Sequence, residues 1–282
     1  MKKIYHFSGA GNDFVVIDGR EGDVSAFREV PRIEALCKEY KTDGLMILGQ
    51  EIPGQAGNDD RSVMADPDRS SVDFTMEFYN PDGSGGMMCG NGGRCIVAFA
   101  DYLGIRPASG DVFLFRAPDG LHTGEILERP EDGLWTVRIK MIDVQGITPM
   151  LGGYFLNTGT RHFVKFVDDV EKVDIDTEGK ALRWNEAFAP IGTNVNFVHI
   201  APDGLHVRTF EKGVEGETLA CGTGLTASAI AAYHAGIPSV IPSEAKESYR
   251  LRARQDWLSV NFTPGADEKF TDVYLTGPAR LL

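Results

Sequence analysis

The sequence of 282 residues lacks a basic cluster, a long apolar run and a dense set of cysteines. Lysine and arginine number 28 against 41 aspartate and glutamate residues, which gives a formal net charge of −13. A chain this acidic is repelled by phosphate backbones and anionic lipids, which disfavours binding to nucleic acid or to a membrane surface. Apolar stretches all fall short of the roughly 18 consecutive residues that a membrane-spanning helix needs. We therefore expect a cytoplasmic protein with neither nucleic-acid nor membrane partners.

Cysteine is also scarce. Cys37, Cys89, Cys95 and Cys221 form no C-x-x-C pair and no disulfide-dense spacing, which is typical of a reducing compartment. No grouping of histidine, cysteine and acidic residues has the spacing of metal ligands, so we predict no metal site. The first residues of the chain reach polar side chains and glycine too soon for a signal-peptide core.

Length and composition favour two domains that each bury a core. Short alternating segments between glycine and aspartate turns predict strands through most of the chain. Residues 50–71 are polar and rich in turn formers, which predicts a long surface loop. Helices are expected at residues 31–40, 90–103 and 176–188, and after Cys221.

An internal repeat relates the two halves of the chain. Cys89-Gly90-Asn91-Gly92 matches Cys221-Gly222-Thr223-Gly224, and a Gly-Ile pair follows at the same distance in both copies. The simplest interpretation is two related α/β halves joined face to face.

In both copies the cysteine precedes glycines that open a helix. Free N–H groups and partial positive charge at a helix start favour an anion and lower the pKa of a thiol. If a two-fold axis relates the halves, Cys89 and Cys221 face each other across a cleft. One thiolate could then remove a proton from the carbon next to a bound carboxylate, and the opposite thiol could deliver another. Cys37, on a helix stripe, and Cys95, inside a helix, fit the commoner role of a small buried hydrophobe.

Four further segments follow one another along the whole chain: Gly11-Asn12-Asp13-Phe14, Asn80-Pro81-Asp82-Gly83-Ser84, Cys89-Gly90-Asn91-Gly92-Gly93-Arg94-Cys95 and Gly216-Glu217-Thr218-Leu219-Ala220-Cys221-Gly222-Thr223-Gly224. Together they resemble the diaminopimelate epimerase family. The resemblance implies a cofactor-independent isomerase that converts LL-diaminopimelate, a diamino dicarboxylic acid, to meso-diaminopimelate in lysine and peptidoglycan precursor biosynthesis.

The resemblance also implies the fold. We expect an α/β (α+β) protein of two pseudo-symmetric domains, each a curved, mostly antiparallel sheet wrapped around a central helix. The first domain should cover residues 1–139 together with 276–282, and the second residues 140–275. The oligomeric state stays open, with a homodimer as one candidate.

Roles for individual residues follow from the matching positions. Cys89 and Cys221 correspond to the acid/base pair, and His162 and Glu211 to further catalytic residues. Positions that match substrate contacts are Asn12, Asn80, Gly90, Asn91, Asn194, Glu211, Lys212, Gly222 and Thr223. The resemblance implies neither a cofactor nor a metal.

Three positions depart from the family pattern. Gly44 stands where the family often has glutamine, Thr160 stands where it has asparagine, and Lys212 replaces an arginine. Lysine keeps the charge but loses the planar fork that binds a carboxylate through two hydrogen bonds. All three concern the far end of the substrate, so they bear on its identity and leave the reaction type intact.

Several alternatives stay open. A proline racemase-like enzyme would share the two thiols but usually has histidine after the first Cys-Gly, where this chain has Asn91. A fold relative of the phenazine-pathway isomerase type would have no need of paired cysteines, and a cysteine hydrolase would leave one thiol without a role. A non-catalytic amino-acid-binding protein would tolerate thiol alkylation, whereas an epimerase would lose turnover.

Because two thiols suffice for both proton transfers, the purified protein should be active without pyridoxal phosphate and after treatment with a chelator. Epimerase assays before and after dialysis against the chelator measure this. Activity that is lost on dialysis and restored by pyridoxal phosphate or a divalent metal would contradict it.

Overall fold

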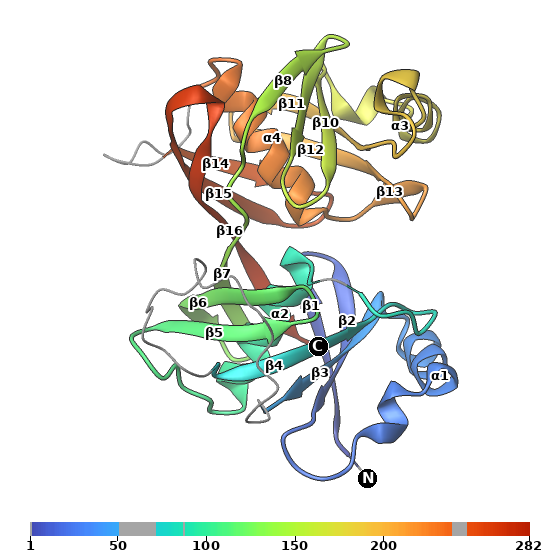
Figure 1. Cartoon of the computed structure of the whole chain (residues 1–282), viewed down its shortest axis with the longest axis vertical. Helices are drawn as coiled ribbons and strands as arrows, with labels where there is room; N and C mark the ends of the chain where they lie inside the picture. Colours follow the sequence, from blue (N-terminus) through green and yellow to red (C-terminus); the bar gives the residue numbers. More distant parts are fainter. Residues whose placement is uncertain (1, 51–71, 87, 239–246) are drawn as a thin grey trace. The chain divides into compact units, whose positions relative to one another are not determined.

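A computed structural model describes residues 2–50, 72–86, 88–238 and 247–282. Residues 51–71, which hold nearly all of the predicted surface loop, lie outside the described residues. The chain divides into two compact units: unit 1 is Met1–Ile139 with Pro278–Leu282, and unit 2 is Lys140–Gly277. Figure 1 shows α2 in unit 1 and α4 in unit 2, each lying against the sheet of its own unit.

Unit 1 is built on a mixed sheet with the strand order β1-β2-β3-β4-β5-β6-β7. The pairs β2/β3 and β4/β5 are parallel and the other neighbours are antiparallel. The end of β16 (Phe270–Leu281) also pairs with β1. The elements are β1 (Ile4–Gly9), β2 (Asn12–Asp18), η1 (Ser25–Arg28), α1 (Val30–Tyr40), β3 (Gly44–Gly49), β4 (Phe74–Tyr79), α2 (Gly90–Tyr102), β5 (Val112–Ala117), β6 (Gly120–Glu131) and β7 (Leu134–Lys140).

Unit 2 has the strand order β8-β9-β10-β11-β12-β14-β15-β16, with β13 paired to β12. Here β10/β11 and β12/β14 are parallel and the other neighbours are antiparallel. The elements before β16 are β8 (Ile147–Met150), β9 (Gly153–Asn157), β10 (Arg161–Phe166), η3 (Val170–Lys172), η4 (Ile175–Gly179), α3 (Lys180–Arg183), η5 (Glu186–Phe188), β11 (Asn194–Ala201), β12 (Gly204–Glu211), β13 (Gly216–Thr218), α4 (Gly222–His234), β14 (Glu247–Arg252), β15 (Trp257–Pro264) and η6 (Ala266–Glu268).

The succession of parallel and antiparallel pairs in unit 1 recurs in unit 2. Strands β1 to β4 correspond to β9 to β12, and β5, β6 and β7 correspond to β14, β15 and β16. Helix α2, between β4 and β5, corresponds to α4, between β12 and β14. The duplicated α/β architecture predicted from the sequence is therefore confirmed, with β8 and β13 as strands that the sequence patterns did not predict.

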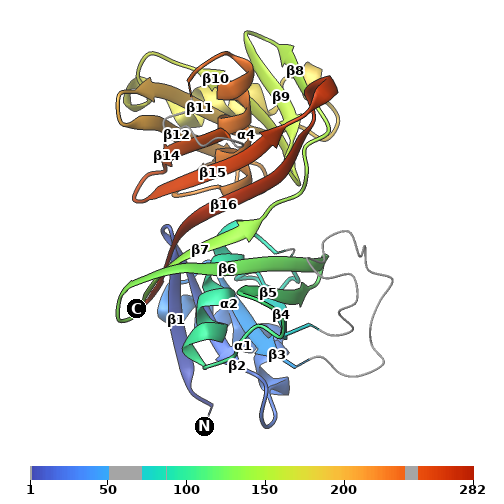
Figure 2. The same cartoon turned by 90° about the vertical axis from the view of Figure 1, so that its left-hand side faces the viewer.

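The helices α2 and α4 are buried because small and apolar residues make up most of their surface, and the buried Asn91 and Arg94 of α2 have hydrogen-bond partners. Every residue from Gly90 to Ala100 is buried, and so is every residue from Gly222 to Ala232 except Thr223. Strands from both halves of each sheet contact its helix, since α2 contacts β1, β2, β3 and β6 and α4 contacts β9, β10, β11, β12, β14 and β15. Each sheet thus curves around its helix, as Figure 2 shows from the side.

The prediction of one continuous helix at residues 176–188 is wrong. The chain forms a π-helical turn at Ile175–Gly179, one α-helical turn at Lys180–Arg183 and a 3₁₀ turn at Glu186–Phe188. Asn185 separates the last two turns because its side chain accepts a hydrogen bond from a backbone N–H two residues later. Asparagine competes with helical hydrogen bonding in this way, and the periodic apolar pattern did not reveal it.

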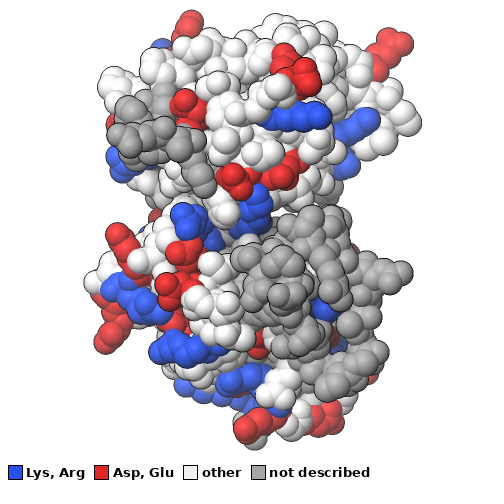
Figure 3. Space-filling model, turned by 60° about the vertical axis from the view of Figure 1, so that its left-hand side comes forward, with Lys and Arg blue, Asp and Glu red and all other residues white. Residues whose placement is uncertain are grey.

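Charged side chains of both signs are interspersed on the face drawn in Figure 3. Within the described part of the chain, no helix combines the length and the hydropathy that crossing a membrane requires.

The ends of α2 and α4 predict a matched pair of stability effects. Gly104 and Gly236 follow the two helices with φ of +76° and +72°, and a Cβ added at either position would meet open space. Gly104→Ala and Gly236→Ala should each lower the free energy of unfolding by about 1 kcal/mol through backbone strain alone. Gly146→Ala is the control, because that position is equally open and lacks a left-handed backbone. Equal denaturant midpoints for all three variants and the wild type would contradict the expectation.

Candidate active site

The thiol of unit 1 stands at the start of a buried helix. Cys89 is the N-cap residue of α2 and is exposed, and its Sγ accepts a hydrogen bond from the N–H of Gly92 at 3.3 Å. A sulfur that accepts this N–H at the positive end of the helix is better stabilised as a thiolate.

A buried guanidinium organises the first turn of α2. Arg94 is fully buried, and its Nη2 donates to Asn91 Oδ1 at 2.8 Å while its Nη1 donates to the carbonyl of Gly90 at 3.1 Å. Asn91 Nδ2 donates to Asn12 Oδ1, and Asn12 Nδ2 donates to Asp43 Oδ2 at 3.2 Å. Unit 1 therefore joins Asn12, Gly90 and Asn91, three of the residues predicted from the sequence.

Asn80 lies in the turn after β4. Its Nδ2 donates to Ser84 Oγ at 3.0 Å, and its backbone N–H donates to the carbonyl of the same serine. Tyr79, the last residue of β4, pairs with Leu45 of β3, so Asn80 and Gly44 lie at the same end of the sheet. A Cβ added at Gly44 would lie 2.7 Å from the Tyr79 carbonyl oxygen, which leaves little room there for a side chain.

The thiol of unit 2 has a different environment. Cys221 begins α4 and is buried, and its Sγ lies 3.4 Å from the Oγ1 of Thr223. Thr223 Oγ1 in turn lies 2.9 Å from Nε2 of His162, which is fully buried. Burial lowers the pKa of His162 to about 3, so its imidazole is neutral at neutral pH. Three predicted residues thus form one chain of polar contacts.

A carboxylic acid adjoins this thiol. Glu211 ends β12, and its Oε2 accepts a hydrogen bond from Thr218 Oγ1 at 3.0 Å. Burial raises the pKa of Glu211, and hydrogen bonds from Thr218 and Cys221 partly oppose that shift. The Glu211 carboxyl therefore lies within hydrogen-bonding reach of the Cys221 sulfur.

Two further predicted residues meet at the start of β11. Asn194 is buried, and its Oδ1 accepts a hydrogen bond from the N–H of Lys212 at 2.7 Å. Its Nδ2 donates to the carbonyl of Arg161 at 2.9 Å and lies 3.5 Å from Thr160 Oγ1. Thr160 and Lys212, two of the positions that depart from the family pattern, are thereby brought to the same asparagine.

Several residues that support these side chains were not identified from the sequence. Thr226 Oγ1 donates to the carbonyl of Gly222 at 3.0 Å, just as Arg94 does to Gly90 in the first copy. The internal repeat could have revealed that Arg94 and Thr226 correspond, because each stands four residues after the first glycine of its motif. No local signal identifies Thr158, whose Oγ1 donates to the carbonyl of Thr223 at 2.9 Å from another part of the fold.

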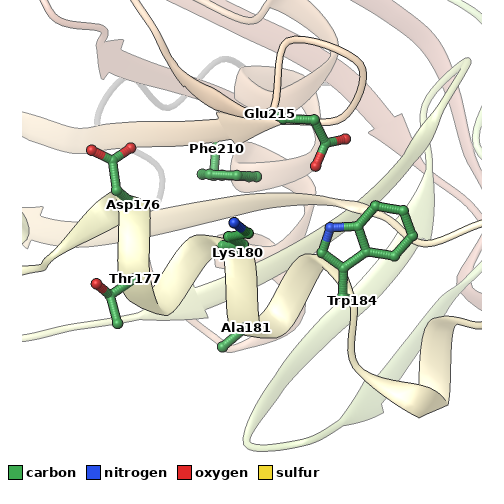
Figure 4. Close-up of a pocket in the computed structure, with 7 residues that line it drawn as sticks. All are labelled: Asp176, Thr177, Lys180, Ala181, Trp184, Phe210 and Glu215. Atoms are coloured by element: carbon green, nitrogen blue, oxygen red, sulfur yellow. The ribbon is translucent and has the colours of Figure 1, made fainter.

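A hollow of about 660 Å³ opens on unit 2, and none of the predicted site residues lines it. Figure 4 shows Lys180 between the carboxylates of Asp176 and Glu215, with Trp184 to one side. Across the described ranges, no three His, Cys, Asp or Glu side chains lie close enough together to hold a metal ion. The hollow is lined by Asp176, Thr177, Lys180, Ala181, Trp184, Phe210 and Glu215.

Comparison with known proteins decides the family. The profile described as diaminopimelate epimerase matches residues 154–281. The diaminopimelate epimerase of Chlorobaculum tepidum is 36% identical over 284 residues, covering 97% of this chain and 96% of the relative. The chain belongs to the diaminopimelate epimerase family. A second relative of the same name, from Flavobacterium psychrophilum, is 34% identical and covers 99% of this chain and 98% of its own length. The family resemblance predicted from the motifs is therefore confirmed, and with it the enzyme class, an isomerase.

The family fold is shared with more distant structures. A phenazine biosynthesis protein of the PhzF family from Bacillus anthracis gives a TM-score of 0.68 at 11% identity, over 99% of this chain and 96% of that one. A hydroxyproline epimerase from Agrobacterium vitis gives 0.62 at 14% identity, over 100% and 89%. At these identities the likeness concerns the fold alone, and it agrees with the predicted diaminopimelate epimerase-like architecture.

The buried, neutral His162 predicts a specific acid sensitivity. The unfolded chain binds a proton at the ordinary pKa of 6.5, whereas the folded protein binds it only near 3. Above about pH 6.5 protonation of His162 therefore costs the folded protein nothing. As the pH falls from there towards 3, the free energy of unfolding decreases by up to about 1.4 kcal/mol per pH unit. His162→Gln should remove this contribution to the pH dependence of the free energy of unfolding. His234→Gln, at the half-buried end of α4, should retain it. Urea unfolding at a series of pH values measures the slopes. Parallel pH dependences for the wild type and His162→Gln would refute the expectation.

Proposed function

We propose that the protein inverts an α-carbon of LL-diaminopimelate to give meso-diaminopimelate, with Cys89 and Cys221 as the two acid/base groups and without a cofactor. The observation that carries the proposal is the cysteine that begins the buried helix of each unit, in a chain of the diaminopimelate epimerase family. Each unit then supplies one half of the enzyme. A cytoplasmic location and a place in lysine and peptidoglycan precursor biosynthesis belong to the same proposal, and the homodimer stays a prediction.

The helix starts would bind the carboxylate next to the reacting carbon. The first N–H groups of a helix have no acceptor within the helix and point along its axis. Gly90 and Asn91 would offer them from α2, and Gly222 and Thr223 from α4. The substrate's remaining polar groups are assigned to the side chains of Asn12, Asn80, Asn194, Glu211 and Lys212.

The distal carboxylate is assigned to Lys212. Its backbone N–H is fixed by Asn194, which anchors the start of this side chain. An ammonium group supplies a point charge where arginine would supply two parallel hydrogen bonds.

The proton balance follows from the single proton of a thiol. One thiolate removes the α-proton, so a C–H bond breaks and an S–H bond forms. The opposite thiol then gives its proton to the other face of the carbon, so its S–H bond breaks and the new C–H bond forms. The two sulfurs end with their protonation states exchanged, and exchange with solvent restores them. Glu211, which contacts Cys221, is the group assigned to that exchange on unit 2.

Isotope exchange tests the two-base mechanism. In deuterated water the first product molecules should carry deuterium at the inverted carbon, because the proton taken by one thiol is not the one delivered by the other. Substrate recovered early should remain largely unlabelled, provided that product leaves faster than it reverts. Equal labelling of substrate and product from the first turnover, measured by mass spectrometry, would rule out the paired thiols.

Single substitutions complete this test. Cys89→Ala and Cys221→Ala should each abolish epimerisation, because one face of the carbon then lacks its acid or base. Any residual α-proton exchange should favour opposite stereoisomers in the two variants. Cys37→Ala is the matched control, since this buried cysteine lies on α1 and packs against the sheet in the core of unit 1, and it should retain turnover. Appreciable epimerisation by either Cys89→Ala or Cys221→Ala would overturn the assignment.

A further inference from the structure

We propose that Asn196, held by Thr209, is a positioning residue for Cys221: it fixes the tautomer of His162 so that the Thr223 hydroxyl donates its proton to the Cys221 sulfur. The inference rests on the proposed function, and it deepens that function by assigning a residue that lies outside the family motifs quoted above.

The orientation of the Asn196 amide is fixed at both ends. Asn196 is fully buried, and its Nδ2 donates to the carbonyl oxygen of Phe163 at 3.2 Å. A carbonyl oxygen only accepts, so this end of the amide must be the NH₂ group. The other end, Oδ1, accepts a hydrogen bond from Thr209 Oγ1 at 2.9 Å.

This amide determines which nitrogen of His162 carries the proton. Asn196 Nδ2 lies 3.0 Å from His162 Nδ1, and an NH₂ group only donates, so Nδ1 accepts. A neutral imidazole that accepts at Nδ1 carries its proton on Nε2. Asn194 Nδ2 lies 3.5 Å from Nε2, but its shorter hydrogen bond, at 2.9 Å, goes to the carbonyl of Arg161. The Nε2–H is therefore directed to Thr223.

The Thr223 hydroxyl donates its own proton onward to the sulfur of Cys221. His162 Nε2 donates to Thr223 Oγ1 at 2.9 Å, which leaves the single hydroxyl proton for Cys221 Sγ at 3.4 Å. A donor to sulfur stabilises the thiolate relative to the thiol. Among the described residues, titratable groups that face Cys221 include Glu211, from the end of β12, and, through Thr223, His162 from β10.

Unit 1 provides an internal comparison because its strands have the same register. Phe14 pairs with Gly44 in the parallel β2/β3 pair, as His162 pairs with Asn194 in β10/β11. Two positions along, Met46 pairs with Phe78 just as Asn196 pairs with Thr209. The positions of His162, Asn196 and Thr209 are therefore occupied in unit 1 by three apolar residues, which are Phe14, Met46 and Phe78.

Contacts of the helix glycines support this correspondence independently. A Cβ added at Gly92 would lie 3.4 Å from Met46 Sδ, and one added at Gly224 would lie 2.3 Å from Asn196 Oδ1. The matching glycines of α2 and α4 thus rest on matching strand positions, one apolar and one polar. The chain of hydrogen bonds is specific to unit 2, and the Cys89 sulfur accepts from the backbone N–H of Gly92 instead.

The test compares the two thiols within the same molecules. Wild type and Asn196→Met, which introduces the residue of unit 1, are treated with iodoacetamide over a range of pH, and alkylation of each cysteine is measured by mass spectrometry. The alkylation midpoint of Cys221 should rise by about one pH unit, the size of one hydrogen bond to a thiolate, while that of Cys89 stays unchanged. In the epimerase assay kcat should fall about tenfold with KM within about twofold, since substrate contacts remain.

A second pair of variants separates the hydrogen bond from general packing. Thr209→Val keeps the shape and removes the hydroxyl, so it should raise the Cys221 midpoint in the same direction, whereas Thr209→Ser should restore the wild-type value. Met46→Leu is the matched control in unit 1 and should leave the Cys221 midpoint unchanged.

The outcomes distinguish this inference from the proposed function. An active enzyme whose Cys221 midpoint is unaltered in Asn196→Met and Thr209→Val would overturn the inference alone. Equal shifts at Cys89 and Cys221 would overturn it too, because they would indicate a general loss of packing. A wild-type protein with distinct thiol midpoints and no epimerase activity would overturn the proposed function.

Discussion

The close approach of each buried helix to the sheet beneath its first turn is the constraint on which the rest of the structure depends. At Gly92 a Cβ would already touch Met46, and at Gly224 it would lie well inside contact distance of Asn196. A side chain at Gly224 would push the start of α4 away from the sheet and carry Cys221 with it, whereas a Cβ at Gly92 would make ordinary van der Waals contact. In unit 2 the second glycine of the Cys-Gly-x-Gly motif is therefore a packing requirement as much as a chemical one.

Burial of the whole helix explains why the sheet curves around it. A helix with small and apolar residues on every side gains most when protein surrounds it, and strands from both halves of each sheet provide that cover. The cysteine at the helix start is thus held at the edge of a rigid core, and its place does not depend on a loop. A rigid support of this kind suits a group that must meet one carbon atom from a fixed direction.

The two units have similar architectures, but the buried residues around the first turns of α2 and α4 differ in polarity. The helix start of unit 1 is organised by the guanidinium of Arg94, whereas that of unit 2 is organised by neutral hydrogen-bonding groups around His162. Buried polar groups are costly unless each one has a partner, and the Asn196 amide has partners at both ends. Two sulfurs on equivalent helices consequently have different neighbours, which suits a reaction in which they take opposite roles.

The sequence by itself indicated two related halves, each with a cysteine before a glycine-opened helix, and it indicated the two cysteines as candidates. Glycine spacing and a repeated motif can be recognised without knowing which strands pair, whereas the sheet curved around each helix was expected only from the family resemblance. Tertiary structure decided which side chains support the thiols: Thr209 bonds to Asn196, and Asn196 to His162, only because β12, β11 and β10 lie side by side. It also decided that residues 175–188 form three short turns, since competition between side-chain and helical hydrogen bonds leaves the periodic pattern unchanged. Contacts of that kind depend on strand register, which a linear pattern does not contain.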